Sequence, residues 1–434
     1  MVESITELIN NKRVLILGYG AEGRSTYRLL SDLGSCTALD IADSNPGGDL
    51  PDCRIHAGAD YLACLEDYDI IIKSPGVAWP GTLPPPGTGK DSGPIITAQT
   101  EQFLRHYKKQ SIGITGTKGK STVASLLYHV LKTKGIPCLL AGNIGLPVFD
   151  IIADIRPEVA IILELSCHQL EHCAHSPATA AFLNIHEDHL DRYATFEEYF
   201  RAKKNIYLHQ GPQDRLYCNT DTKPAAEMAA AQTIMVDGEI LPFAALADIA
   251  GCRLRGAHNR ENVAFVYAIA RNFAISDADF VAALKTYKPL PHRLEYIGER
   301  EGVEYYDDSI STTAQSAINA VESITNAATV LLGGMDRGID YLPLVEYLAN
   351  SRLSHIICMY ESGKRLYGML EGREGLVPSL NYCDDLAAAT QLAMRLTPPG
   401  FACILSPAAA SYGDFKDFAA RGDAFRRLVF SFPR

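Results

Sequence analysis

The feature that most constrains this sequence is a glycine-rich turn between a short apolar run and a longer amphipathic run. Residues 111–115 (SIGIT) have the composition of a buried strand, and the run from Ser121 has the apolar spacing of a helix that stops at Gly135. The turn before that helix contains Gly116, Thr117, Lys118 and Gly119. Backbone N–H groups in such a turn can point at a phosphate, and the helix start adds partial positive charge. We therefore predict an α/β fold with a nucleoside-triphosphate site here.

The residues after the turn supply the rest of this chemistry. Lys120 can reach the outer phosphates, and the hydroxyl of Ser121 or Thr122 can bind a magnesium ion. The usual first glycine of a P-loop would fall on Ile114, so the motif is a shortened variant, G-x-x-G-K-S-T. The alternative is a strand-to-helix turn that binds no ligand. That alternative does not explain why a strand, glycines, a lysine, hydroxyl groups and a helix follow one another in the order that a phosphate site requires.

Length and charge limit the remaining possibilities. The 434 residues suggest about three domains, at roughly 150 residues each. A formal charge of -11 argues against nucleic acid or an anionic membrane as a general partner. The 11 cysteines lack paired spacing, and those in the 167–175 cluster fit no usual zinc pattern, so we expect reduced thiols in a cytoplasm. No apolar run approaches the ~20 residues of a membrane span.

The N-terminal part carries a second glycine motif. Gly18, Gly20 and Gly23 form G-x-G-x-x-G after an apolar run, and the next predicted strand leads to Asp40 or Asp43. Such a turn lets a diphosphate approach a helix start, so a nicotinamide dinucleotide and a UDP-sugar both remain candidates. A further strand, 69–73, ends in a Ser-Pro-Gly turn.

The central part places acidic and basic groups after predicted strands. Residues 159–163 form a buried strand that delivers Glu164 to its carboxyl end, where a P-loop sheet needs a magnesium ligand. A carboxylate capping a neighbouring helix is the alternative. A strand over 178–185 leads to the polar run 186–191, and an amphipathic helix over 196–209 carries Lys203 and Lys204. A solvated helix face would explain these lysines as well.

The C-terminal part again alternates strands and helices. A helix over 256–273 carries Asn259 and Asn262 on one face, and the proline-bounded PLPHR segment, 289–293, is predicted to be a hinge. Polar clusters follow strands at 303–306, 330–334 and 404–406, and a helix is expected to carry Phe415, Phe418 and Arg421. None of these clusters contains a P-loop, so they are candidate donors for a second substrate.

An ordered set of strings extends over essentially the whole chain. It comprises G-T-K-G-K-S-T, G-N-I-G-L-P, L-E-L-S-C-H-Q-L-E, E-D-H-L-D-R-Y, A-K-K-N-I, H-N-R-E-N, P-H-R, D-D-S, L-G-G and L-S-P-A-A-A-S. With these strings the sequence resembles the Mur ligases, and its length and C-terminal strings resemble the members that add D-glutamate. The resemblance implies a Rossmann-like N-terminal domain (1–108), a central P-loop α/β domain (109–292) and a Rossmann-like α/β C-terminal domain (293–434).

The resemblance also implies an activity. ATP would phosphorylate the carboxylate of UDP-N-acetylmuramoyl-L-alanine, and the amine of D-glutamate would displace phosphate to form an amide, in cytoplasmic peptidoglycan precursor synthesis. Two Mg²⁺ ions, a carbamylated Lys203 and a monomeric enzyme are expected, with no nucleic-acid partner and no membrane insertion. Carbamylation would give Lys203 the oxygen donors that a hard cation prefers.

Site residues follow from matching the strings. Candidate catalytic residues are Lys120, His189, Lys203, Asn143 and His292. Candidate ATP-binding residues are Gly116, Thr117, Lys118, Gly119, Lys120, Ser121, Thr122, Asn262, Arg293 and Asp308. Candidate metal ligands are Ser121, Glu164, His189 and Lys203. The UDP-sugar would contact Gly20, Ala21, Glu22, Gly23, Ser44, Ser74, Gly76, Asn143, Ser166, Gln169 and His189. D-Glutamate would contact Thr312, Arg337, Ser411 and Phe418.

Three positions depart from what the family's ligands would favour. Arg337 and Ile310 stand where some members have lysine, and Glu22 is an acidic residue beside an expected pyrophosphate, so we expect its backbone to face the ligand. Competing interpretations are another Mur-type or folylpolyglutamate-type ligase, a nucleotide-binding protein without ligase activity, and an NAD-dependent oxidoreductase. A folylpolyglutamate-type enzyme would leave the N-terminal glycine motif without a role.

Overall fold

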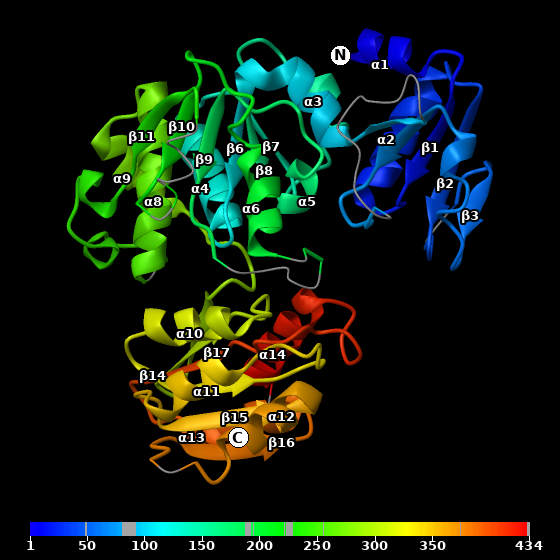
Figure 1. Cartoon of the computed structure of the whole chain (residues 1–434). Coiled ribbons are helices and arrows are strands. Elements are labelled where there is room, and N and C mark those ends of the chain that lie inside the picture. Colours follow the sequence, from blue (N-terminus) through cyan, green and yellow to red (C-terminus); the bar gives the residue numbers. More distant parts are fainter. Residues whose placement is uncertain are drawn as a thin grey trace. The chain divides into compact units, whose positions relative to one another are not determined.

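The computed structural model describes residues 1–47, 50–79, 93–186, 192–193, 195–220, 222, 229–254, 256–373 and 375–431. These residues form two compact units, which are described separately (Figure 1). The first unit comprises Met1–Ala244 and Glu261–Leu284, and the second comprises Ala245–Arg260 and Lys285–Arg434. Across the described ranges, no helix combines the length and apolar character that crossing a membrane requires.

The first unit begins with a five-stranded parallel sheet in the order β3-β2-β1-β4-β5. Its strands are β1 (Arg13–Leu17), β2 (Ala38–Asp43), β3 (Ile55–Ala57), β4 (Ile70–Lys73) and β5 (Ile95–Thr97), and its helices are α1 (Val2–Ile9), α2 (Ala21–Leu33) and α3 (Gln99–Tyr107). The buried runs of β1 and β4 match strands covered on both faces, which confirms the strand and helix predicted around G-x-G-x-x-G. The strand order reverses beside β1, so the turns after β1 and β4 leave the same edge and open a crevice.

The second sheet of this unit has six parallel strands in the order β11-β10-β9-β6-β8-β7. Its strands are β6 (Ser111–Thr115), β7 (Cys138–Gly142), β8 (Ala160–Glu164), β9 (Thr179–Phe182), β10 (Arg215–Cys218) and β11 (Gln232–Met235). The helices are α4 (Lys120–Thr133), α5 (Cys167–Leu170), α6 (Phe196–Lys204), α8 (Ala257–Ala270) and α9 (Asp277–Thr286). Residues 257–260 of α8 and 285–286 of α9 belong to the second unit. Because β6 lies between β9 and β8, the glycine-rich turn leaves the middle of the sheet.

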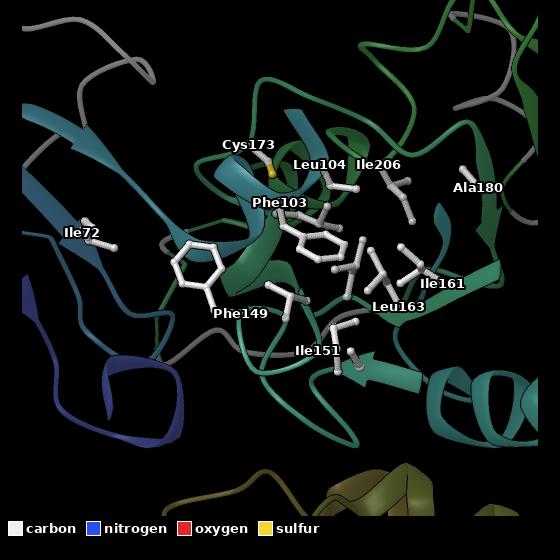
Figure 2. Close-up of a cluster of buried hydrophobic side chains, with 14 of the residues drawn as sticks. Ile72, Phe103, Leu104, Phe149, Ile151, Ile161, Leu163, Cys173, Ala180 and Ile206 are labelled. Carbon is white, nitrogen blue, oxygen red and sulfur yellow. The ribbon is translucent and has the colours of Figure 1, made fainter. Parts of the chain in front are cut away.

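A hydrophobic cluster joins these elements within the first unit. Figure 2 shows Phe103 and Leu104 of α3 among side chains that include Ile161 and Leu163 of β8. All four are fully buried. Burying apolar surface stabilises the folded state by about 25 cal/mol per Å² and is the main stabilising contribution to such a core. The core therefore holds the strands of this unit in fixed positions.

The second unit contains a mixed sheet in the order β12-β13-β17-β14-β15-β16, in which only the β12–β13 pair is antiparallel. Its strands are β12 (Glu295–Arg300), β13 (Val303–Asp307), β14 (Ala327–Leu332), β15 (His355–Met359), β16 (Ser379–Cys383) and β17 (Ala402–Leu405). Its helices are α10 (Ala314–Ser323), α11 (Leu342–Ala349), α12 (Tyr360–Leu370), α13 (Leu386–Leu396) and α14 (Phe418–Ser431). Two cores flank the sheet, one with side chains of α10, α11 and α12 and the other with side chains of α13 and α14.

Two helix predictions were wrong in extent. The helix predicted over 196–209 ends at Lys204, because Asn205 donates its side-chain amide to the Leu170 carbonyl and accepts from the Ser176 hydroxyl. The last helix begins at Phe418, so Phe415 precedes it. Asp417 accepts from the N–H of Ala420 and satisfies a free donor at the helix start.

Candidate active site

The glycine-rich turn leads from β6 directly into α4. Gly119 has φ +83°, and a Cβ atom there would collide with the side chain of Asn262 on α8. Lys120 donates from Nζ to the carbonyls of Gly116 (3.0 Å) and Thr117 (2.9 Å). The lysine therefore folds back across the turn, and the helix start behind it has the chemistry of an anion site.

Glu164 lies at the end of β8, the strand that pairs with β6. Its Oε1 accepts from Nδ2 of Asn143 at 2.7 Å. Its Oε2 is buried and has no hydrogen-bond partner among the described residues. A buried carboxylate oxygen without a partner costs free energy, which a cation would offset. Glu164 therefore fits the role of a magnesium ligand. The predicted second ligand, Ser121, lies in the first turn of α4, which follows β6, the strand paired with β8.

The two neighbouring lysines of α6 have different surroundings. Lys203 is 1% exposed, donates from Nζ to the Gly116 carbonyl at 2.8 Å and lies 4.9 Å from the centre of the Tyr199 ring. Lys204 instead pairs with the exposed Glu197 at 3.1 Å. The structure thus brings Lys203 to the glycine-rich turn. His189, the other expected ligand from this part of the chain, lies outside the described residues.

A cavity of about 560 Å³ opens at the reversal point of the first sheet. Among its lining residues are eight of the predicted UDP-sugar residues, namely Gly20, Ala21, Glu22, Ser44, Ser74, Gly76, Asn143 and Gln169. Gly20 has open space where a Cβ would stand, whereas a Cβ on Gly23 would collide with the carbonyl of Gly18. Gly23 therefore permits close packing of helix on strand and does not line the cavity.

Ser166 does not line the cavity, although Gln169, to which it is hydrogen-bonded, does. Its hydroxyl caps α5 by accepting from the Gln169 N–H at 3.2 Å. Gln169 in turn donates from Nε2 to Oε1 of Glu22 at 2.7 Å. The Glu22 side chain is thus paired within the protein, and burial raises the pKa of its carboxyl group. The expectation that only the Glu22 backbone faces the ligand stays a prediction.

The predicted D-glutamate residues of the second unit follow three neighbouring strands. Thr312 follows β13, Arg337 follows β14, and Ser411 follows β17, while Phe418 begins α14. Thr312, Arg337 and Phe418 are exposed, and Ser411 is buried. Parallel strands bring these loops to one edge of the sheet, so three of the predicted residues lie on adjacent loops.

His292 and Asp307 form a buried pair in the same unit. Nδ1 of His292 lies 2.7 Å from Oδ2 of Asp307, and this hydrogen bond raises the pKa of the imidazole. The His292 N–H bonds Glu295, whose other oxygen accepts from Arg426 at 2.6 Å. His292, Glu295 and Asp307 could geometrically share a cation, but each already has a protein partner. The group therefore fits a structural network better than a metal site.

Asp308, a predicted ATP contact, is also buried beside this pair. Its carboxylate accepts from the Ser406 hydroxyl at 2.7 Å and from the Leu294 N–H at 3.1 Å. Burial nevertheless raises the pKa of Asp308 to about 7. Arg293, between His292 and Leu294, is half-buried.

The sequence placed Arg421 on the last predicted helix, beside the candidate donors for a second substrate, and Arg421 is the largest fully buried side chain among the described residues. It donates to the carbonyls of Ser309, Ala409 and Ala410 and to the Ser309 hydroxyl. Arg421 thereby ties the loop after β13 to the loop after β17. The sequence signal for this buried role was an arginine on the apolar face of a predicted helix.

Known proteins are similar to this chain in sequence and in fold. The family model described as Mur ligase middle domain matches residues 114–238. A UDP-N-acetylmuramoylalanine–D-glutamate ligase from Acetivibrio thermocellus is 30% identical, with 97% of each chain covered. One from Geotalea uraniireducens is 31% identical, covering 96% of this chain and 97% of that protein.

Solved structures agree at the level of the fold. A MurF ligase from Thermotoga maritima in complex with ADP has a TM-score of 0.59 at 15% identity, over 98% of this chain and 95% of that one. The UDP-N-acetylmuramate–alanine ligase MurC from the same organism has a TM-score of 0.57 at 15% identity, over 96% and 98%. The full-length similarity to the D-glutamate ligases, together with the matched middle domain, shows that the chain belongs to the Mur ligase family.

Proposed function

We propose that this chain is an ATP-dependent ligase that adds D-glutamate to UDP-N-acetylmuramoyl-L-alanine during peptidoglycan precursor synthesis. Full-length similarity to proteins named for this reaction supports the substrate pair. The structural observation that carries the proposal is the position of Asn143, which lines the cavity and donates to the partly unpaired Glu164. Asn143 thus lies between the cavity, the proposed site of the UDP-linked substrate, and Glu164, a proposed magnesium ligand for phosphoryl transfer.

The reaction uses the phosphate-binding turn first. In this proposal Lys120 and the N–H groups of the turn hold the ATP phosphates, and Asn262, Arg293 and Asp308 complete the nucleotide site. A carboxylate oxygen of the substrate attacks the γ-phosphorus and ADP leaves, which gives an acyl phosphate. The transferred group carries its charge on peripheral oxygens, so positioned cations and donors supply most of the stabilisation.

Amide formation follows at the same carbonyl carbon. The amine of D-glutamate, held by Thr312, Arg337, Ser411 and Phe418, attacks and loses a proton. The resulting tetrahedral intermediate expels phosphate as the C–O bond breaks, with His292 and Asn143 beside the reacting groups. Exclusion of water protects the acyl phosphate from hydrolysis during this step.

Two Mg²⁺ ions are part of the proposal. Ser121 and Glu164 would hold the first, and His189 and a carbamylated Lys203 would hold the second. The ions would neutralise charge on the phosphates. The buried position of Lys203 at the Gly116 carbonyl supports its role, because a carbamate there would stand beside the same turn.

The substrates indicate the cellular compartment in which the enzyme acts. ATP and a UDP-linked precursor are cytoplasmic molecules, so we propose a cytoplasmic enzyme. We propose separately that it acts as a monomer. We also propose that residues 1–108, 109–292 and 293–434 act as domains for the UDP-sugar, ATP and D-glutamate respectively.

Phosphate release from ATP tests the proposal directly. Release should require UDP-N-acetylmuramoyl-L-alanine and D-glutamate together, and a panel of amino acids with the same acceptor reveals the preferred amine. Release with L-glutamate or L-lysine but not D-glutamate would reassign the substrate. Release only with a folate acceptor and L-glutamate would support the folylpolyglutamate-type alternative.

The carbamate has a separate test. Isotope-labelled bicarbonate should give a carbamate signal in wild-type protein by nuclear magnetic resonance, and Lys203→Ala should lose it while the matched Lys204→Ala keeps it. Short-chain carboxylic acids should partly restore turnover to Lys203→Ala. A signal that survives Lys203→Ala would exclude this lysine as the modified residue.

A further inference from the structure

The loop after β14, residues 333–341, is held by an ion pair with α12. Arg365 donates from Nε to Oδ2 of Asp336 at 2.7 Å and from Nη2 to Oδ1 at 2.9 Å. Two parallel hydrogen bonds fix the plane of the guanidinium relative to the carboxylate, which a single contact would not do. The pair therefore fixes the backbone immediately before Arg337.

The same two side chains also fix the backbone after Arg337. Oδ1 of Asp336 accepts from the N–H of Gly338 at 2.9 Å, and Arg365 donates to the Ile339 carbonyl at 2.8 Å. The guanidinium of Arg365 lies 4.6 Å from the centre of the Tyr341 ring. Arg337 itself is exposed between these anchored positions.

The anchored loop is joined to the loop that carries Ser411. The Met335 N–H donates to the Ala410 carbonyl at 2.9 Å, and the buried Tyr341 hydroxyl donates to the Ala408 carbonyl at 3.0 Å. Tyr341 thus contacts both Arg365 and the neighbouring loop. A shift at Asp336 or Arg365 would change the position of Arg337 relative to Ser411.

We propose that Asp336 and Arg365 are positioning residues that set the placement of the Arg337 guanidinium and thereby the preference for an amino acid with a second carboxylate. This inference rests on the proposed function. It goes further by naming residues outside the binding set that control amino-acid selectivity. Arginine at position 337 makes such control necessary, because a planar fork binds a carboxylate well only in a defined orientation.

The exposure of the pair separates this role from simple stabilisation. The side chains of Arg365 and Asp336 are 35% and 29% exposed, so solvent screens the pair and reduces its contribution to stability. Loss of the pair should therefore change substrate binding more than unfolding. This difference makes the proposal testable by kinetics.

Arg365→Met and Asp336→Asn are the test variants. Each should raise the KM for D-glutamate about tenfold, the effect of loosening one charge-assisted contact, with little change in kcat, in the KM values for ATP and the UDP-linked substrate, or in Tm. The ratio of kcat/KM for D-glutamate over D-glutamine should fall, because D-glutamine lacks the side-chain charge. Arg365→Lys keeps the charge without the fork and should resemble Arg365→Met.

Arg352→Met is the matched control. Arg352 is an exposed arginine of the same unit that donates to the carbonyls of Val321 and Ile324, away from the loop after β14. It should leave the D-glutamate KM unchanged. An equal rise in Arg352→Met would show that any loss of an arginine in this unit has the effect.

Coupling to Arg337 gives the decisive measurement. In an Arg337→Ala background, Arg365→Met should add no further rise in the D-glutamate KM, because both changes remove the same contact. Additive effects, or a normal KM in Arg365→Met and Asp336→Asn, would overturn the positioning role while the ligase function stands. Wild-type protein without D-glutamate-dependent phosphate release would overturn the proposed function and this inference with it.

Discussion

The glycine-rich turn of the first unit and the loops of the C-terminal unit both have charged side chains beside them, but these side chains differ in their hydrogen bonds. Beside the turn, Oε2 of Glu164 is buried without a partner among the described residues. In the C-terminal unit, Arg421 and the Asp336–Arg365 pair make several hydrogen bonds within the protein. The buried Glu164 oxygen is thus an electrostatic requirement left unmet beside the turn, whereas Arg421, Asp336 and Arg365 have their hydrogen bonds made inside the protein.

This difference indicates a division of labour. An unpaired buried carboxylate carries a free-energy cost that a bound cation can offset, so it belongs where charge must be neutralised during reaction. A charged side chain whose hydrogen bonds are all made inside the protein holds the neighbouring backbone in place and contributes little to ligand binding. We therefore expect substitutions near the turn to remove turnover, and substitutions around the C-terminal loops to change selectivity or stability.

Lys120→Ala should have the largest effect. Losing the ammonium that we propose contacts the phosphates should cost at least about 3 kcal/mol of transition-state stabilisation, more than a hundredfold in kcat. Phosphate release measures this loss. Lys132→Ala, which removes an exposed lysine from the same helix, is the control and should retain turnover. Near-normal kcat in Lys120→Ala would place the triphosphate elsewhere.

Glu164→Gln should come next, with a loss of roughly a hundredfold in kcat at fixed Mg²⁺, the range seen when one electrostatic contact to developing charge is removed. The amide keeps the size of the side chain, so Oε1 can still accept from Asn143. Without metal, the variant should be at least as stable as wild type, because the unpaired carboxylate is gone.

Thermal unfolding supplies the second measurement for Glu164→Gln. ADP with Mg²⁺ should raise the Tm of wild-type protein more than that of the variant, by mass action on the folded state. Equal Mg²⁺-dependent shifts in Tm would show that Glu164 does not hold the ion, and would remove the contrast between the two regions.

Local pattern was enough to predict much of the fold. The β6 strand, the start of α4 and the glycine turns follow from apolar periodicity and from glycines at positions where the backbone allows no side chain, such as Gly23 and Gly119. The position of Glu164 at a strand end was likewise predictable, because one buried run led directly to it.

Long-range partners could not be predicted in the same way. Nothing local shows that Lys203 reaches the Gly116 carbonyl, that α6 ends early through Asn205, or that Arg421 bonds three distant carbonyls. These contacts depend on how segments far apart in sequence pack together. The pairing of Asp336 with Arg365 is of the same kind, since 29 positions separate the two residues.

Gly23→Ala and Gly20→Ala separate packing from ligand binding in the first sheet. Gly23→Ala should destabilise the protein by about 2–3 kcal/mol, because its Cβ would overlap the Gly18 carbonyl. Gly20→Ala should leave stability nearly unchanged, because its Cβ would meet no atom, but should raise the KM for the UDP-linked substrate, because Gly20 lines the cavity. Chemical denaturation and steady-state kinetics measure the two effects. Equal stability of the two variants would contradict the packing role of Gly23.

Asp308 gives the smallest effect and tests how complete the C-terminal network is. Burial raises its folded-state pKa from the ordinary aspartate value of 3.8 to about 7, so the folded protein keeps this proton at pH values where the unfolded chain has lost it. The stability from Asp308 is therefore fully present below about pH 4 and is lost as pH rises toward 7, with a limiting slope of about 1.4 kcal/mol per pH unit. Asp308→Asn lacks this titration.

The free energy of unfolding of Asp308→Asn relative to wild type should accordingly rise by roughly 1 kcal/mol between pH 5.5 and 6.5 and become constant above about pH 8. Urea denaturation at each pH measures the difference, and comparison with the variant cancels titration of other groups, including His292. A difference that stays flat across this window would mean that the bonds from Ser406 and Leu294 already hold the carboxylate ionised. The Asp308 carboxylate would then be fully stabilised by its hydrogen bonds, like Arg421 and the Asp336–Arg365 pair. The unpaired Glu164 oxygen would differ from all of them.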